Sequence, residues 1–238
     1  MPPVERAREQ DAILAALAPV ADGLAATLGS FCEVVVHDFR RPERSVVAIA
    51  GSVTGRQVGG AMSEIGMGLV ARGDEAADEL NYVTRTQSGK LLKSSTMVLR
   101  DSSGTVFGAL CVNLDVTAVQ QAGVLIAGLA GVAEPAPVPT TTFGNDIDSV
   151  VDSLVDTHQL RQGKTWSALD RDERLRLFAA LDADGVFAVR GAAQRVAERL
   201  GISRASAYNY LAQARQTPLA PHQDGTGPQD TDRNGEPT

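Results

Sequence analysis

The stretch that most constrains this chain is Ala192 to Leu211, which reads AAQRVAERLGISRASAYNYL. Apolar residues recur at helical spacing on both sides of Gly201, and Ser203 is a residue type that caps helix N-termini. A glycine at the corner and a small residue at Ala197 are what two steeply crossing helices need at a short turn. The pattern therefore predicts a helix-turn-helix, with an ordinary helical hairpin as the alternative.

The second of these helices predicts which side chains face DNA. Arg204 and Asn209 lie within one and a half turns and are the predicted base contacts, because Arg reads guanine and Asn reads adenine in the major groove. Ser203 and Ser206 are predicted to contact phosphate or to cap the helix. Tyr208 either touches DNA or packs on the preceding helix. Because one module binds weakly, we expect a homodimer that reads two half-sites about 34 Å apart on double-stranded DNA.

Charge is distributed unevenly along the chain. The formal net charge of −7 excludes a protein that coats nucleic acid indiscriminately. Between residues 191 and 216, however, several arginines accompany a single acid: Arg195, Arg199, Arg204 and Arg215, with Glu198. This asymmetry predicts a small DNA-reading module carried by an acidic partner domain.

The chain before this module has the patterns of an antiparallel sheet with helices. A helical stripe ends at Leu28, and Pro19 inside it predicts a kink or a fresh helix start. Strands are predicted at residues 32–39, 45–50, 91–100 and 105–115, a short helix ends at Gly73, and residues 116–133 form a weak helical pattern. The predicted fold class is α+β: an N-terminal antiparallel sheet with helices, followed by an all-α helix-turn-helix domain.

A proline-rich segment marks the clearest domain boundary. Residues 134–142, EPAPVPTTT, are predicted to link a first domain at 10–133 to a second at 143–216. Within the second domain, Val186 to Val189 is predicted to be extended. Residues 217–238 are polar, contain Pro and Gly and have no periodicity, so we expect a disordered tail.

Alternation along two predicted strands gathers polar side chains. Ser94 and Thr96 share one face of their strand, and Asn113 shares a face with Cys111 and Phe107 on the next. A few polar groups in mainly apolar surroundings are typical of a small-molecule site. Asn113 capping backbone groups is the alternative.

His37 and Arg56 are predicted to add charge recognition to this ligand site. For His37, a histidine whose hydrogen bonds are satisfied within its strand is the alternative. Arg56 belongs to a glycine-rich loop, residues 51–60, which lacks the Lys-Ser or Lys-Thr of a phosphate loop. This excludes nucleoside-triphosphate binding by that loop.

The sequence predicts no enzyme, metal or cofactor site. Cys32 and His37 fall on opposite strand faces, so they do not form a catalytic pair. His37, His158 and His222 are scattered without metal-ligand spacing, and no haem or flavin signature is present. Cys32 and Cys111 are expected to be buried free thiols, with a redox role as the alternative.

The localisation expected from the sequence is cytoplasmic, without membrane attachment. The N-terminal residues lack the hydrophobic core and cleavage site of a secretion signal. The apolar run from Gly123 to Ala133 is too short and too rich in glycine to span a bilayer.

Five segments together carry a family resemblance. They are GSFCEVVVHDF (29–39), VVAIAGSVTGRQVGG (46–60), NYVTRTQSGKLLKSSTMVLRDSSG (81–104), GALCVNLDV (108–116) and GVFAVRGAAQRVAERLGISRASAYNYL (185–211). In combination they resemble the YheO-like PAS regulators, which include DauR-type repressors. The resemblance implies a PAS-like sensor domain, a helix-turn-helix that reads an operator, and an effector related to amino-acid metabolism.

The predicted function is a DNA-binding transcriptional regulator, a repressor, whose PAS-like domain senses a small metabolite and which reads its operator as a dimer. The main alternative makes the PAS-like domain a ligand-free dimerisation or protein-docking module. An enzyme with an accessory helical domain is a third hypothesis, which needs a base–nucleophile pair that the sequence does not offer.

Overall fold

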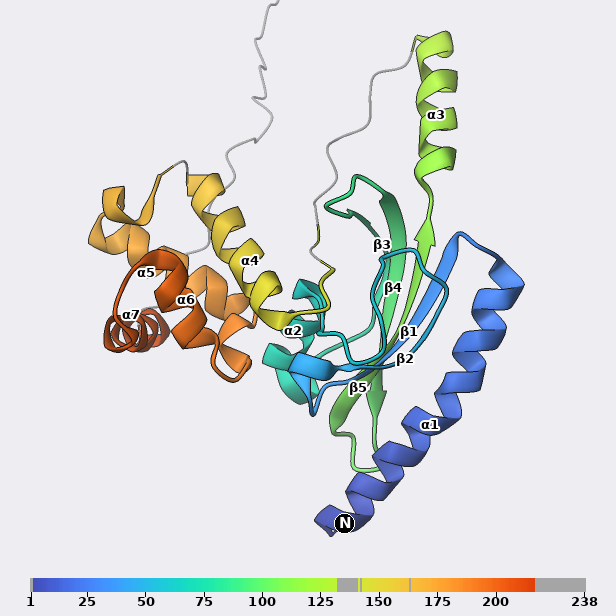
Figure 1. The fold of residues 1–238 in the computed structure, drawn as a ribbon, viewed down its shortest axis with the longest axis horizontal. Coiled ribbons are helices and arrows are strands. Elements are labelled where there is room, and N and C mark those ends of the chain that lie inside the picture. Colours follow the sequence, from blue (N-terminus) through green and yellow to red (C-terminus); the bar gives the residue numbers. More distant parts are fainter. Residues whose placement is uncertain (1, 132–140, 142, 163, 217–238) are drawn as a thin grey trace, which may run out of the picture.

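We analysed a computed structural model, which describes residues 2–131, 141, 143–162 and 164–216. Figure 1 shows a sheet-containing part followed by a helical part. The first part consists of α1 (Pro3–Leu28), β1 (Cys32–Asp38), β2 (Val46–Ala50), α2 (Glu64–Arg72), β3 (Glu79–Arg85), β4 (Leu91–Arg100), β5 (Val106–Asp115) and α3 (Thr117–Ala130). The second consists of α4 (Ile147–Gln162), α5 (Arg171–Ala183), α6 (Ala192–Leu200) and α7 (Arg204–Gln216).

The strands form one antiparallel sheet in the order β2-β1-β5-β4-β3. The helix α1 covers one face through an apolar cluster with β1 and β5, and α2 covers the other. This confirms the predicted α+β class and the four predicted strands. The predicted linker, apart from Thr141, and the predicted tail at 217–238 lie outside the described residues.

The N-terminal helix is one continuous element from Pro3 to Leu28 that includes Pro19, so the fresh helix start, one of the two predictions for Pro19, is wrong. By length and composition alone it is the one helix in the described part of the chain that could cross a membrane. In this structure it lies on the sheet: Leu14 is buried there, and Gln10 Nε2 donates to Asp101 Oδ2 at 2.8 Å.

The edge strand β3 was not predicted, because its sequence does not alternate cleanly. Asn81 has φ of 58°, and the pairing register with β4 shifts between Glu79 and Tyr82. Leu80 consequently points to solvent, 56 % exposed. Such an irregularity hides a strand from a period-of-two pattern.

A second irregularity in the sheet places Phe107 on the face opposite to the predicted one. The register of β4 and β5 shifts beside Leu99, so that Gly108 and Val106 have partners on β4 while Phe107 has none. Phe107 therefore packs in the α1 cluster, whereas Cys111 contacts the core on the α2 side. The prediction that Phe107 shares a face with Cys111 and Asn113 is wrong, because the bulge inverts the alternation.

The helical part packs around aromatic side chains of α5 and α7. Phe178 stacks on Phe187 and Tyr210, with ring centroids 5.7 and 5.4 Å apart, and Trp166 meets Tyr210 edge-on. Val186 to Ala188 is a 3-10 helix, so the extended stretch predicted there is wrong. The chain closes into this turn because Gly185 adopts a left-handed conformation, with φ of 79°.

The two parts share one apolar core. Met67 of α2 is fully buried in the same cluster as Phe178 of α5. Gly185 sits so close to α2 that a Cβ placed on it would lie 2.1 Å from Met67 O. Asn145, just before α4, accepts hydrogen bonds from Gln57 N (3.0 Å, at Oδ1) and Ala61 N (3.2 Å, at the backbone oxygen). Through Met67, α2 thus packs against the helical part as well as against the sheet.

This contact predicts unequal effects for two glycine substitutions. Gly191 also has positive φ, 85°, but nothing lies within 4 Å of a Cβ placed there. We expect Gly191→Ala to lower the free energy of unfolding by about 1 kcal/mol. Gly185→Ala must also separate α2 from the 3-10 turn and should cost about 3 kcal/mol or more. Urea unfolding of both variants checks this, and equal losses would contradict the close contact.

Candidate DNA interface and buried polar site

The corner between α6 and α7 has the predicted geometry. Gly201 takes the left-handed conformation with φ of 67°, and Ile202 N donates to Ala197 O at 2.9 Å. Ser203 caps α7, its Oγ accepting from Ser206 N at 3.0 Å and lying 2.8 Å from Ser206 Oγ. Ser203 therefore fills the capping role predicted for it, and Ser206 supplies the N–H that is capped.

One face of α7 is buried and the other faces solvent. Ala207, Leu211 and Ala214 pack inward. Ser203, Arg204, Tyr208 and Asn209 are exposed, and Ser206 is half-buried. This is the separation that a recognition helix needs, since its outward residues must reach base edges.

The outward residues are ordered by one another. The Arg204 guanidinium lies over the Tyr208 ring, 5.4 Å from its centroid, and donates to the Tyr208 hydroxyl at 3.4 Å. Asn209 Oδ1 accepts from Gln213 Nε2 at 3.0 Å. Tyr208, which is 49 % exposed, therefore holds Arg204 on the exposed face of α7.

The basic surplus predicted for this segment is mostly neutralised. Three arginines are held by carboxylates from α4 and α5, with Nε–Oδ distances of 2.8 Å: Arg195–Asp152, Arg199–Asp156 and Arg215–Asp182. These carboxylate partners are distant in sequence, so the charges within residues 191–216 alone do not reveal them. Among the arginines of α6 and α7, whose residues are all described, Arg204 is the one without a carboxylate partner.

The five predicted ligand-site residues come together on the sheet face that α2 covers, and all are buried: His37, Arg56, Ser94, Thr96 and Asn113. Ser94 Oγ donates to Asn113 Oδ1 at 2.8 Å, and an Arg56 Nη1 contacts His37 Nε2 at 3.3 Å. The strand parity used for Ser94, Thr96 and Asn113 places them on a common face here.

The centre of this polar site is Glu33, which the sequence analysis missed. Its side chain is 0 % exposed and accepts from Thr54 N (2.8 Å), Thr54 Oγ1 (2.7 Å), Arg56 Nη2 (3.3 Å) and Asn113 Nδ2 (3.3 Å). A buried carboxylate is tolerable only with such partners. The signal that could have found it is an acid set directly before three valines in the strand-like run CEVVVHDF.

The histidine of this site is neutral. Burial, and secondly the Arg56 charge, hold the pKa of His37 well below its ordinary value of 6.5. With Nε2 accepting from Arg56, Nδ1 carries the proton and donates to Ser45 Oγ at 2.9 Å. His37 is therefore an acceptor for Arg56, not a second positive charge.

Tyr82 and Cys111 complete the far side of the network. The Tyr82 hydroxyl lies 3.0 Å from Thr96 Oγ1, which lies 3.4 Å from Cys111 Sγ. Burial raises the pKa of Tyr82 to about 12 and also raises that of the Cys111 thiol. Both groups stay protonated near neutral pH, so this cysteine lacks the thiolate that a nucleophile or redox centre needs.

Little free space remains inside this network. The cavity that His37, Arg56, Tyr82 and Thr96 help to line has a volume of about 10 Å³, which suits a single water. Its other wall consists of Phe143 and α2 residues including Ile65 and Gly66. The Arg56 guanidinium lies 5.1 Å from the centroid of the Phe143 ring. A molecule larger than water does not fit in this cavity as it stands.

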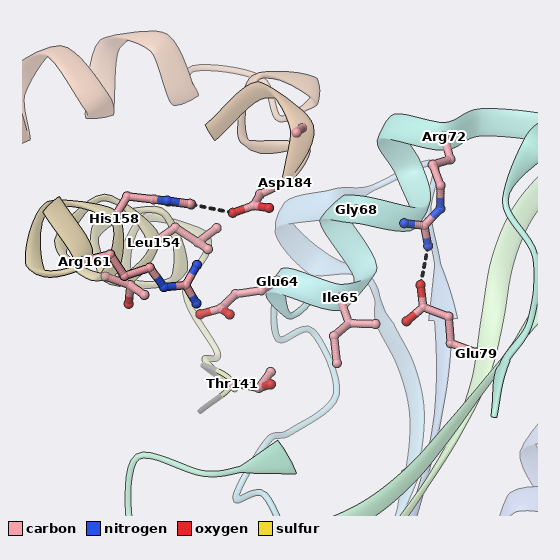
Figure 2. Close-up of a pocket in the computed structure, with 12 residues that line it drawn as sticks. Glu64, Ile65, Gly68, Arg72, Glu79, Thr141, Leu154, His158, Arg161 and Asp184 are labelled. Atoms are coloured by element: carbon pink, nitrogen blue, oxygen red, sulfur yellow. Dashed lines mark hydrogen bonds and ion pairs between the residues drawn. The ribbon is translucent and has the colours of Figure 1, made fainter. Parts of the chain in front are cut away.

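A larger cleft, of about 290 Å³, lies between α2 and α4 (Figure 2). On the α2 side Arg72 pairs with Glu79, and on the α4 side His158 Nε2 lies 2.6 Å from Asp184 Oδ2. Figure 2 shows these pairs on opposite walls. Over the described residues, no group of three or more His, Cys, Asp or Glu side chains is arranged to hold a metal.

Comparison with known proteins agrees with this architecture. The family model of the YheO-like PAS domain matches residues 8–130, and a model of an HTH domain matches residues 150–212. The chain is 28 % identical to the uncharacterized protein YheO of Escherichia coli K12, over 84 % of each chain. It is 28 % identical to the transcriptional regulator DauR of Pseudomonas aeruginosa, over 87 % of this chain and 97 % of DauR. An uncharacterized protein of Haemophilus influenzae is 27 % identical, over 87 % and 94 %.

A PAS-like sheet domain joined to a helix-turn-helix with an exposed recognition face defines a DNA-binding transcriptional regulator. Within that class, this chain belongs to the YheO-like PAS family.

The arginine pattern predicts how two substitutions affect DNA binding. Arg204→Ala should lower affinity for a selected DNA site by roughly tenfold or more and relax discrimination there, since a bidentate base contact contributes about 1–3 kcal/mol. Arg215→Ala is the matched control, because Asp182 already holds its guanidinium. It should leave affinity nearly unchanged. Fluorescence anisotropy with labelled duplexes measures both, and equal losses would argue against a base-reading Arg204.

The neutral His37 predicts a pH dependence of stability. Below pH 6.5 an unfolded chain protonates this histidine, whereas the folded chain does not. Because the unfolded state then binds more protons, the free energy of unfolding falls as pH falls, by up to about 1.4 kcal/mol per pH unit. His37→Gln retains an acceptor for Arg56 without titrating, so its slope between pH 7 and 5 should be shallower. Urea unfolding at each pH measures the slope, and an unchanged slope in His37→Gln would contradict a neutral, buried His37.

Proposed function

We propose that this protein is a cytoplasmic transcriptional repressor, without catalytic activity, that binds its operator as a homodimer. A small metabolite in the buried polar site would change its affinity for DNA. The observation that carries the proposal is the shared wall of the cavity: α2 lines the polar site and also packs in the core of the helical part, and Phe143, which lines the same site, lies just before α4 in the chain. The regulator DauR, similar along nearly its whole length, supports the regulatory role.

The coupling follows from the size of the cavity. At about 10 Å³, it has no room for a metabolite, so one of its walls must yield. The sheet wall is held by ladders on β1, β4 and β5, and the opposite wall is a single helix and one aromatic ring. Ligand entry therefore displaces Phe143 and α2. A ligand shifts the protein between two arrangements only by binding one of them more tightly. In this proposal the ligand binds more tightly to the arrangement in which Phe143 and α2 are displaced.

The chemistry of the site suggests the kind of ligand. Arg56, Thr96 and Asn113 line the cavity, and Glu33, which is bonded to Arg56 and Asn113, adds a negative group directly behind them. A small molecule that carries both an amino group and a carboxylate matches Glu33 and Arg56. We therefore propose an effector related to amino acids, as the family resemblance also implies.

A ligand-free role for the PAS-like domain is the second candidate, and one observation favours it. Glu33, Arg56 and Asn113 already satisfy one another without any bound molecule. A thermal-shift screen with amino acids of both hands and their amine and keto-acid derivatives separates the two. An effector present at 100 times its dissociation constant stabilises by about 2.7 kcal/mol. If no compound raises the melting temperature, the dimerisation or docking role stands instead.

The DNA-binding part of the proposal is tested by selection from fragmented genomic DNA. Retained fragments are footprinted and then titrated at several salt concentrations. We expect a protected site of two related half-sites, with affinity that falls steeply as salt rises. Protection that does not depend on sequence would defeat the proposal.

Phe143→Ala tests the route from ligand to DNA. Removing the ring enlarges the cavity without touching Glu33 or the strand hydroxyls. We expect compounds from the screen to raise the melting temperature of the variant as before. Their effect on operator affinity should shrink by roughly tenfold or more, which corresponds to about 1.4 kcal/mol of coupling. A variant whose DNA binding still responds like the wild type would show that Phe143 is not part of the route.

A further inference from the structure

The helix α3 stands apart from the rest of the sheet domain (Figure 1). It contains no buried residue, and four large apolar side chains are exposed: Val119 (71 %), Leu125 (70 %), Ile126 (66 %) and Leu129 (92 %). Its sequence, TAVQQAGVLIAGLA, has no ionisable side chain. Contiguous exposure of this kind marks an interaction surface.

The apolar surface extends beyond α3 to the end of α1. Phe31, which is 52 % exposed, follows α1, and its carbonyl accepts from Asp115 N just before α3. Leu24 and Leu28 of α1 are each 37 % exposed. Phe31, which follows the C-terminal end of α1, is thus bonded to the residue that leads into α3, and the exposed side chains near it can add to the surface of α3.

The sequence outside the described residues contains few large apolar side chains that could match this surface. Residues 132–140 contain three prolines, and Val132 and Val138 are their large aliphatic residues. In residues 217–238, Leu219 is the one large aliphatic side chain. A lipid surface is also a poor match, since helices that lie on membranes carry Lys or Arg on their polar face and α3 has neither.

We propose that α3 packs against α3 of a second copy of this chain, with Leu24, Leu28 and Phe31 at the margin of the interface. A helix without charge meets its own copy without like-charge repulsion. Ala122, Gly123 and Ala130 lie among its large side chains, and small residues let two helix axes approach closely. The same surface on both copies makes a two-fold contact. This inference rests on the dimer of the proposed function and assigns it a surface.

Sedimentation equilibrium of the full chain, without DNA or effector, tests the interface. We expect the wild type to be dimeric, and Leu125→Asp to weaken the dimer by roughly 100-fold or more, because each copy would bury a carboxylate against its partner. Since α3 buries no residue in the monomer, circular dichroism of the variant should match the wild type. Leu160→Asp is the matched control: Leu160 is also on a helix, α4, and is 80 % exposed. It should leave the dimer intact.

Each outcome decides the inference separately from DNA binding. A monomeric wild type overturns it, even if that monomer binds an operator. A Leu125→Asp chain that dimerises like the wild type overturns it by placing the contact elsewhere. Co-sedimentation with vesicles of phosphatidylglycerol and phosphatidylethanolamine that Leu125→Asp abolishes would reassign α3 to lipid. A dimer lost in Leu125→Asp and kept in Leu160→Asp supports it, whether or not an operator is found.

Discussion

The buried ion pair between Glu33 and Arg56 is the interaction on which the rest of the sheet domain depends. A fully buried carboxylate is costly unless its partners are fixed, and removing one partner of such a pair typically costs about 3–5 kcal/mol. Holding Arg56 in place requires the glycine-rich loop to fold back over β1, where Thr54 also reaches Glu33. The Arg56 guanidinium also lies over the Phe143 ring. The ion pair therefore helps to position Phe143, from which the chain continues into α4.

The helix α2 extends this dependence into the second half of the chain. One side of it closes the polar cavity through Ile65 and Gly66, and the other side buries Met67 against the helical part. The proposed displacement at the cavity would therefore act on the same apolar cluster that packs Ala207 and Leu211 of the recognition helix. Packed interfaces of this kind tend to switch between discrete arrangements, since close-packed interiors deform little.

Local patterns sufficed for some features of this chain and failed for others. The corner at Gly201 and the outward residues of α7 follow from spacing within about twenty positions, and so do the strands that hold Ser94 and Asn113. The hub at Glu33 and the pairing of Arg195 with Asp152 depend on partners distant in sequence, which no local pattern contains. The bulge at Phe107 inverts strand parity through an unpaired residue, and only the pairing with the neighbouring strand reveals it.

The close approach of Gly185 to Met67 has a consequence for the design of fragments and chimeras of this protein. A helical fragment cut at the proline-rich segment would leave α2 behind and expose the apolar surface on which α2 rests. The helix-turn-helix part therefore cannot be exchanged between proteins as an independent folding unit. A chimera that transfers it to another sensor, or lends this sensor another DNA reader, has to carry α2 and its glycine contact across the junction, or rebuild both.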